Sequence, residues 1–106
     1  MVSKLVRDRI PEIMQKAGLS VKTRTLPAEE RLHWLLLKLE EEAAELVRDP
    51  SIEECADVFE VIKAIAFQLG FSEKDLLIAA EEKVKARGAF DLGIILQGSG
   101  GEDGRD

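Results

Sequence analysis

The chain has 106 residues, of which 45% are apolar and 34% charged, and its formal net charge is −6. This length and composition are typical of one soluble globular domain with a real core. The negative charge argues against binding along a nucleic-acid polymer, and no apolar run approaches the roughly 20 residues that cross a membrane. The single cysteine, Cys55, cannot form an internal disulfide, which favours a reducing, cytoplasmic location.

The N-terminal part predicts one short helix. Pro11 suits the first turn of a helix, and Gly18 is placed to end it. Residues 20–27 then alternate polar with apolar or β-branched types, which suggests a brief extended piece.

Two longer helices are predicted next, from about residue 28 to 47 and from about residue 50 to 69, because apolar residues recur there at helical spacing. Asp49 followed by Pro50 is a stop-and-restart signal, since Asp caps helices and Pro suits the first helical position. If the chain folds back at this point, the two segments form an antiparallel helix hairpin.

A fourth helix is predicted from Ser72, with Asp75 three residues later in a capping-box pattern, to about Gly88. Residues 94–96 would form a short strand or pack against the helices. Residues 97–106 contain glycines and acids but no large apolar residue, which predicts a disordered acidic tail after a domain of residues 1–96. The expected fold is therefore all-α, a bundle of about four helices around the central hairpin.

Acidic residues concentrate between residues 38 and 60, where nine carboxylates stand against two basic residues. In an antiparallel hairpin, residues with equal number sums lie at the same height, so Glu45 would face Glu54 and Glu42 would face Asp57. The i, i+3 spacing also places both members of each helix on one side. Four converging carboxylates repel one another unless a cation lies among them. A hard divalent cation with oxygen ligands fits this arrangement.

Plainer interpretations stay open for these carboxylates. Acidic residues on helices are usually a solvated face. Glu54 also fits the capping partner of Ser51, because Ser51-x-x-Glu54 matches a capping box. Glu41, next to Glu42 but rotated outward, is a weaker candidate that would orient a water.

Basic residues near both ends of the chain form a second group. They either balance local acids on a solvated face or bind the phosphates of a metal-bound ligand, arginine through its planar fork and lysine as a point charge. The group consists of Lys4, Arg7, Arg9, Lys83, Lys85 and Arg87.

The carboxylate pattern resembles a known signature. Glu41-Glu42-x-x-Glu45 followed by Glu54-x-x-Asp57 resembles the EExxE…ExxD signature of the MazG-like superfamily of all-α nucleoside triphosphate pyrophosphohydrolases. The segments KLVRDRIPEI, ADVFEVIKAI and EEKVKARGAF resemble a small phosphoribosyl-ATP pyrophosphohydrolase-like subgroup, so the resemblance spans about residues 4–96. Two departures are the short link of eight residues between the two motifs and RGAF where RGGF is commoner.

The resemblance implies a Mg²⁺-dependent hydrolase, with Mn²⁺ as an alternative ion, that cleaves a nucleoside triphosphate between its α and β phosphates. It implies four metal ligands, Glu42, Glu45, Glu54 and Asp57, and catalytic roles for Glu41 and Glu42. The basic residues Lys4, Arg7, Arg9, Lys83 and Arg87 would bind the phosphates. A house-cleaning role and a homodimer or homotetramer are further implications, and spare apolar residues such as Trp34 and Phe67 suit a partner subunit.

Two alternatives accompany this prediction. One is a non-catalytic helical interaction module whose acidic face serves for docking. The other is hydrolysis of phosphoribosyl-ATP itself, which the sequence does not separate from general triphosphate hydrolysis because substrate choice depends on pocket shape.

Overall fold

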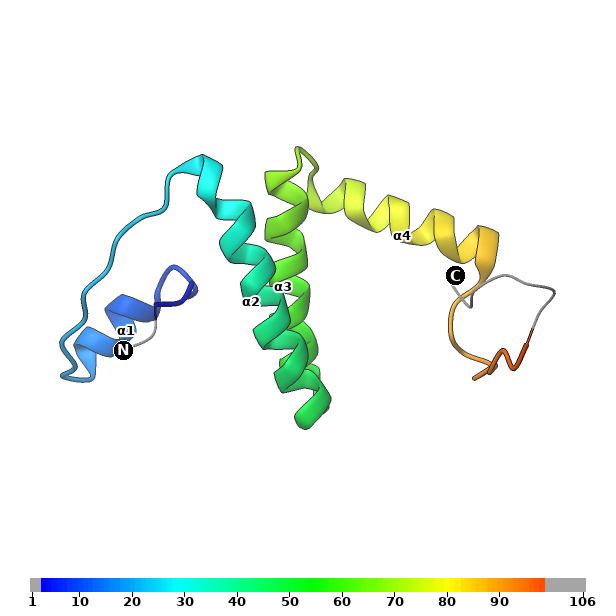
Figure 1. The fold of residues 1–106 in the computed structure, drawn as a ribbon, viewed down its shortest axis with the longest axis horizontal. Helices are drawn as coiled ribbons and strands as arrows, with labels where there is room; N and C mark the ends of the chain where they lie inside the picture. Colours follow the sequence, from blue (N-terminus) through cyan, green and yellow to red (C-terminus); the bar gives the residue numbers. More distant parts are fainter. Residues whose placement is uncertain (1–2, 99–106) are drawn as a thin grey trace.

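The computed structural model describes residues 3–98, and within them the chain forms four α-helices and no strand (Figure 1). The helices are α1 (Ile10–Lys16), α2 (Ala28–Arg48), α3 (Ile52–Gln68) and α4 (Glu73–Arg87). The all-α prediction is thus confirmed. Neither residues 20–27 nor residues 94–96 form a strand. The tail predicted for residues 97–106 lies outside the described residues, apart from its first two.

The ends of the helices follow local chemistry. Pro11 lies in the first turn of α1, and Gly18, just beyond its end, has φ +87°, a backbone conformation that side chains with a Cβ rarely adopt. α3 begins at Ile52 rather than at Pro50, because Ser51 is its N-cap and the Ser51 hydroxyl accepts a hydrogen bond from the Glu54 N–H at 3.1 Å. Pro50 therefore precedes the cap and is not the first helical residue.

α2 and α3 lie side by side and run in opposite directions, with the chain reversing at residues 49–51 (Figure 1). Leu35 of α2 and Val61 and Ala66 of α3 are the buried apolar residues of the part that the structure describes. The core is therefore a narrow seam between two helices. Acidic side chains near the reversal are brought next to each other by the same packing.

The other two helices do not close a bundle around this pair. α4 contacts α3 near their junction and then projects away, while α1 makes no close backbone approach to another helix within residues 3–98 (Figure 1). The radius of gyration is 17.9 Å, whereas a compact domain of this length has about 13 Å. The four-helix count is confirmed, but the bundle predicted from the sequence is not seen in a single chain.

Much apolar surface is consequently left uncovered. Phe67 is 72% exposed, and the residues that follow α4 are exposed as well, with Phe90 at 86% and Ile95 at 80%. Residues 94–96 thus do not pack against the helices of their own chain. Among the described helices, none combines the length and the apolar character needed to span a membrane.

Candidate functional site

Three carboxylates converge where α2 and α3 face each other near the reversal. One oxygen each from Glu42, Glu54 and Asp57 lies within 4.8 Å of the other two. Glu42 comes from the second half of α2, and Glu54 and Asp57 come from the first two turns of α3. The i, i+3 spacing puts Glu54 and Asp57 on one side of α3, and the opposite directions of the helices bring Glu42 to the same height. We call these three residues the carboxylate cluster.

Glu45, the fourth predicted ligand, lies beside this cluster and not in it. No oxygen of Glu45 joins the group within 4.8 Å. Its charge nevertheless acts on Glu54. Partial burial raises the pKa of the Glu54 carboxyl, and the charges of Glu45, Asp57, Glu42 and Asp49 raise it further.

Two oxygens of the cluster have no hydrogen-bond donor. Glu42 is only 8% exposed, and its Oε2, like the Oε2 of Glu54, is buried without a partner among the described residues. A buried carboxylate oxygen in this condition is unfavourable, since it has lost its water and gained no donor in exchange. Coordination of a cation would relieve this penalty at both oxygens at once.

Of the two hydrogen bonds of the capping box predicted for Ser51 and Glu54, only one is present. Ser51 does cap α3 by accepting a hydrogen bond from the Glu54 N–H. No return bond from the Ser51 N–H to the Glu54 side chain forms, and one oxygen of this carboxylate is buried without a partner among the described residues. The carboxylate therefore faces the cluster instead of closing a capping box.

Lys38 is the cation of this region that the sequence analysis missed. Its Nζ donates to Glu41 Oε2 at 2.9 Å and lies 3.3 Å from Glu42 Oε1, and its side chain is only 14% exposed. Burial lowers the pKa of Lys38, but the hydrogen bonds to Glu41 and Glu42 and the negative charges of these residues together outweigh it and leave the pKa raised. The signal was present in the sequence, because both partners lie at i+3 and i+4 from Lys38.

Glu41 lies outside the cluster and is held by two lysines. Besides the Lys38 contact, Lys4 Nζ approaches Glu41 Oε2 at 3.7 Å. The hydrogen bond from Lys38 is the main cause that lowers the pKa of Glu41. This environment keeps Glu41 ionised and engaged, which suits a residue that positions Lys38 better than one that takes up a proton.

Of the three N-terminal residues predicted to bind phosphate, two reach the acidic region and one does not. Arg7 Nη2 donates to Asp57 Oδ1 at 2.7 Å, so the N-terminal segment contacts the cluster directly. Lys4 reaches Glu41. Arg9, by contrast, pairs with Glu12 of its own helix at 3.3 Å.

Lys83 and Arg87 are not brought to the cluster within this chain. Both belong to the second half of α4, where every residue is exposed. This part of α4 projects away from α2 and α3 (Figure 1). The sequence analysis grouped them with the other basic residues because of their charge. The direction in which α4 projects depends on tertiary packing, which the charge pattern does not specify.

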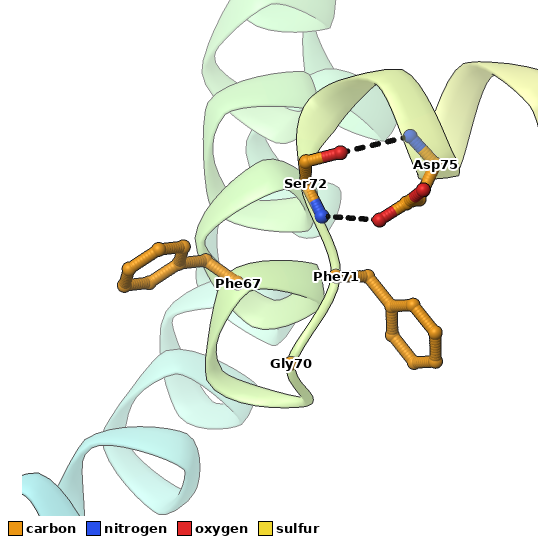
Figure 2. Close-up of a pocket in the computed structure, with 5 residues that line it drawn as sticks. All are labelled: Phe67, Gly70, Phe71, Ser72 and Asp75. Carbon is orange, nitrogen blue, oxygen red and sulfur yellow. Dashed lines mark hydrogen bonds between the residues drawn. The ribbon is translucent and has the colours of Figure 1, made fainter.

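A separate hollow of about 450 Å³ lies at the corner between α3 and α4. Figure 2 shows the rings of Phe67 and Phe71 on opposite sides of the chain at Gly70. Ser72 and Asp75 border the hollow and form a complete capping box, in which the Ser72 N–H donates to Asp75 Oδ2 at 2.8 Å and the Asp75 N–H donates to Ser72 Oγ at 3.1 Å. The carboxylate of Asp75 is thus occupied, and the hollow offers apolar surface, not ligands.

Comparison with known proteins identifies no relative: no protein-family model, no curated protein and no solved structure matches this chain. The resemblance to the MazG-like superfamily therefore stays a prediction from its motifs. The functional argument rests on the residues of the cluster and on their geometry.

Proposed function

We propose that this chain is a Mg²⁺- or Mn²⁺-dependent nucleotide pyrophosphohydrolase whose cation binds at Glu42, Glu54 and Asp57. The observation that supports this most is the Glu42 carboxylate, which is 8% exposed and has one buried oxygen without a donor beside two further carboxylates. An acidic face that only contacts solvent or a partner needs no such buried oxygen. The nucleotide chemistry comes from the motif resemblance.

The donor set fits a hard divalent cation. All three groups are carboxylates, the ligands that Mg²⁺ and Mn²⁺ prefer. Two oxygens bound to one Mg²⁺ lie at most about 4.2 Å apart, since each bond is about 2.1 Å long. Adjacent ligands of an octahedral ion lie nearer, about 3 Å apart, so side chains whose oxygens are up to 4.8 Å apart would move closer together when the ion binds. Glu45, which already acts on Glu54 by its charge, is the nearest candidate for a fourth ligand.

The surrounding residues have distinct roles in this proposal. When bound, the cation neutralises phosphate oxygens and lowers the pKa of a water molecule. Lys38 holds Glu42 Oε1, so Glu42 Oε2, which has no donor among the described residues, would be the oxygen left to coordinate the cation. Arg7 contacts Asp57 of the cluster and Lys4 contacts the neighbouring Glu41, and both would stabilise negative charge on the departing pyrophosphate. Glu41 orients Lys38.

The substrate would be a nucleoside triphosphate or phosphoribosyl-ATP, cleaved between the α and β phosphates to a monophosphate and pyrophosphate. Both substrates present the same anhydride to the cation. The pocket for base and sugar would need more wall than one chain supplies, because α1 and α4 leave the pair of α2 and α3 open. We therefore propose at least a homodimer that covers exposed apolar residues such as Phe67 and Phe71, and sedimentation as a monomer would contradict this.

The experiment is pyrophosphate release from a panel of nucleoside triphosphates and phosphoribosyl-ATP, with Mg²⁺ and with a chelator. Glu42→Gln removes one ligand charge from the cluster. Glu53→Gln is the matched control, because Glu53 is an exposed residue of the same acidic segment and lies outside the cluster. We expect metal-dependent release from the wild type and from Glu53→Gln, and none from Glu42→Gln.

The ranking of substrates would identify the nucleotide class. A folded protein that releases pyrophosphate from none of them would contradict the proposal and favour the interaction module with an acidic docking face.

A further inference from the structure

Asp57 lies between two groups of opposite charge, the other carboxylates of the cluster and the guanidinium of Arg7. It belongs to the carboxylate cluster, and its Oδ1 also accepts a hydrogen bond from Arg7 Nη2 at 2.7 Å. Arg7 comes from the N-terminal segment, 50 positions earlier in the chain. The side chains of Arg7 and Asp57 are 54% and 37% exposed. The ion pair is therefore open to water and able to exchange partners.

Arg7 and Lys4 connect the N-terminal segment to the acidic region. Besides Arg7, Lys4 approaches Glu41 at 3.7 Å, and Leu5 and Val6 between them are half-buried. The helix that follows, α1, makes no close backbone approach to the other helices within residues 3–98. Movement of the Arg7 side chain thus requires no rearrangement of helix packing.

A divalent cation at Asp57 and the Arg7 guanidinium oppose each other. If Arg7 stayed at its present distance while a cation bound either oxygen of Asp57, the two positive groups would lie no more than about 7 Å apart. At that separation salt screens the repulsion only partly. Each ligand of Asp57 must therefore weaken the binding of the other, by the same factor in both directions.

We propose that Arg7 is an intramolecular competitor of the divalent cation at Asp57, and that it transfers from Asp57 to a phosphate oxygen of the ligand that the cation binds. The inference rests on the proposed function, because it needs a cation in the cluster. A cation that binds alone must displace Arg7 without offering it a new partner. A cation that binds with a phosphate offers the guanidinium an anion that suits its planar fork.

Arg7 consequently makes the binding of cation and phosphate interdependent. The competition weakens binding of the bare cation, and the transfer strengthens binding of the cation–phosphate complex. Removal of the guanidinium should therefore change the two affinities in opposite directions. A residue that only supported the fold would change both affinities in the same direction.

The chain contains a matched control for this test. Arg9 lies two residues further on and carries the same charge and fork, but it pairs with Glu12 and not with the cluster. Arg9→Ala therefore changes the net charge as Arg7→Ala does and leaves Asp57 alone. Glu42→Gln serves to show that any bound cation lies in the cluster.

The first measurement is a titration with Mn²⁺ alone, followed by the electron paramagnetic resonance signal of the free ion. The second is calorimetric titration with inorganic pyrophosphate at saturating Mg²⁺. We expect Arg7→Ala to bind Mn²⁺ about three- to fivefold more tightly, the size expected for loss of an exposed ion pair. We expect it to bind pyrophosphate about tenfold more weakly, since a charge-assisted contact is lost. Arg9→Ala should match the wild type in both.

The outcomes separate this inference from the proposed function. Absence of Mn²⁺ binding by the wild type would overturn both. Mn²⁺ binding that Glu42→Gln removes, with equal or weaker binding by Arg7→Ala, would overturn the competition and leave the metal site standing. Tighter Mn²⁺ binding with unchanged pyrophosphate binding would overturn the transfer to the ligand.

Thermal unfolding shows whether each variant is folded. Should Arg7→Ala fail to fold, Arg7→Gln takes its place, because it removes the charge and keeps a polar side chain. For Arg7→Gln we expect the same two directions, and changes in any other direction would overturn the inference.

Discussion

The first turns of α3 and α4 carry the same sequence signature and use it differently. Ser51-x-x-Glu54 and Ser72-x-x-Asp75 each place a hydroxyl at the N-cap and a carboxylate three residues later. At α4 both reciprocal hydrogen bonds form, and the carboxylate is satisfied locally. At α3 only the serine hydroxyl takes part, and the carboxylate of Glu54 turns to the cluster with a buried, unpartnered oxygen.

The difference comes from what lies opposite each helix end. The start of α3 packs against α2, so Glu54 meets Glu42 from another helix. The start of α4 lies at an exposed corner, where no other carboxylate approaches Asp75 closely enough to form a group with it among the described residues. The Glu54 carboxylate lies among other carboxylates instead of making its local bond, and this distinguishes the start of α3 from the start of α4. We expect experiments to separate the two ends in four ways.

The largest difference should appear in cation-dependent activity. Glu54→Gln removes a proposed ligand, and we expect pyrophosphate release to fall at least about a hundredfold, since even residues that only orient ligands contribute about 10–100-fold. Asp75→Asn makes the matched change at the other helix start and should leave release within about twofold, the scatter of a surface substitution. Equal losses of pyrophosphate release in the two variants would contradict a specific role of Glu54 in activity.

The next difference concerns two lysines: Lys38, which contacts Glu42 of the cluster, and Lys63, which contacts Glu73 at the start of α4. Lys38→Met leaves Glu42 buried without its counter-charge, so we expect the free energy of unfolding to fall by about 3 kcal/mol. Lys63→Met removes more exposed contacts to Glu60 and Glu73, both at 3.2 Å, and should lower the free energy of unfolding by much less. Urea unfolding without divalent cation measures both. A smaller effect for Lys38 than for Lys63 would contradict the burial argument.

The caps themselves should differ less. Ser72→Ala removes one half of a complete capping box and Ser51→Ala removes the single cap bond of α3, so each should lower the free energy of unfolding by about 1 kcal/mol.

Substitution of the carboxylate at each helix start separates the two starts more sharply than substitution of the serine. Without divalent cation, Asp75→Ala should destabilise because a cap bond is lost, whereas Glu54→Gln should stabilise because repulsion in the cluster falls. Destabilisation by Glu54→Gln without cation would indicate an ordinary capping residue.

The smallest expected effect is a dependence on pH. The folded state raises the pKa of Glu54 above its ordinary value near 4.5, so the folded chain binds a proton more readily than the unfolded chain. This contribution makes the protein more stable as pH falls through the raised pKa towards 4.5, and less stable above it. The difference in stability between wild type and Glu54→Gln should thus shrink as pH falls through this window, when no divalent cation is present. A difference that stays constant would show that Glu54 is not perturbed in the folded protein.

Local patterns in the sequence determined much of this protein. Helical spacing and helix-end residues predicted four helices close to their observed bounds, because these signals act within a few residues. The assumption of a reversal between the two long helices was enough to place Glu42, Glu54 and Asp57 together. The i, i+3 and i+4 contacts of Lys38 were equally readable and were overlooked.

Only the tertiary structure decided which carboxylates keep local partners and which meet across helices. It placed Glu45 beside the cluster, where its charge acts on Glu54 but none of its oxygens joins the group. It brought Arg7 onto Asp57 across 50 positions and directed Lys83 and Arg87 away with α4. Charge patterns specify attraction but not direction, and the direction of a helix beyond a corner depends on the surfaces that pack there. In this chain that packing distinguishes the carboxylate of Asp75, which caps a helix, from that of Glu54, which lies among other carboxylates with an unpartnered oxygen.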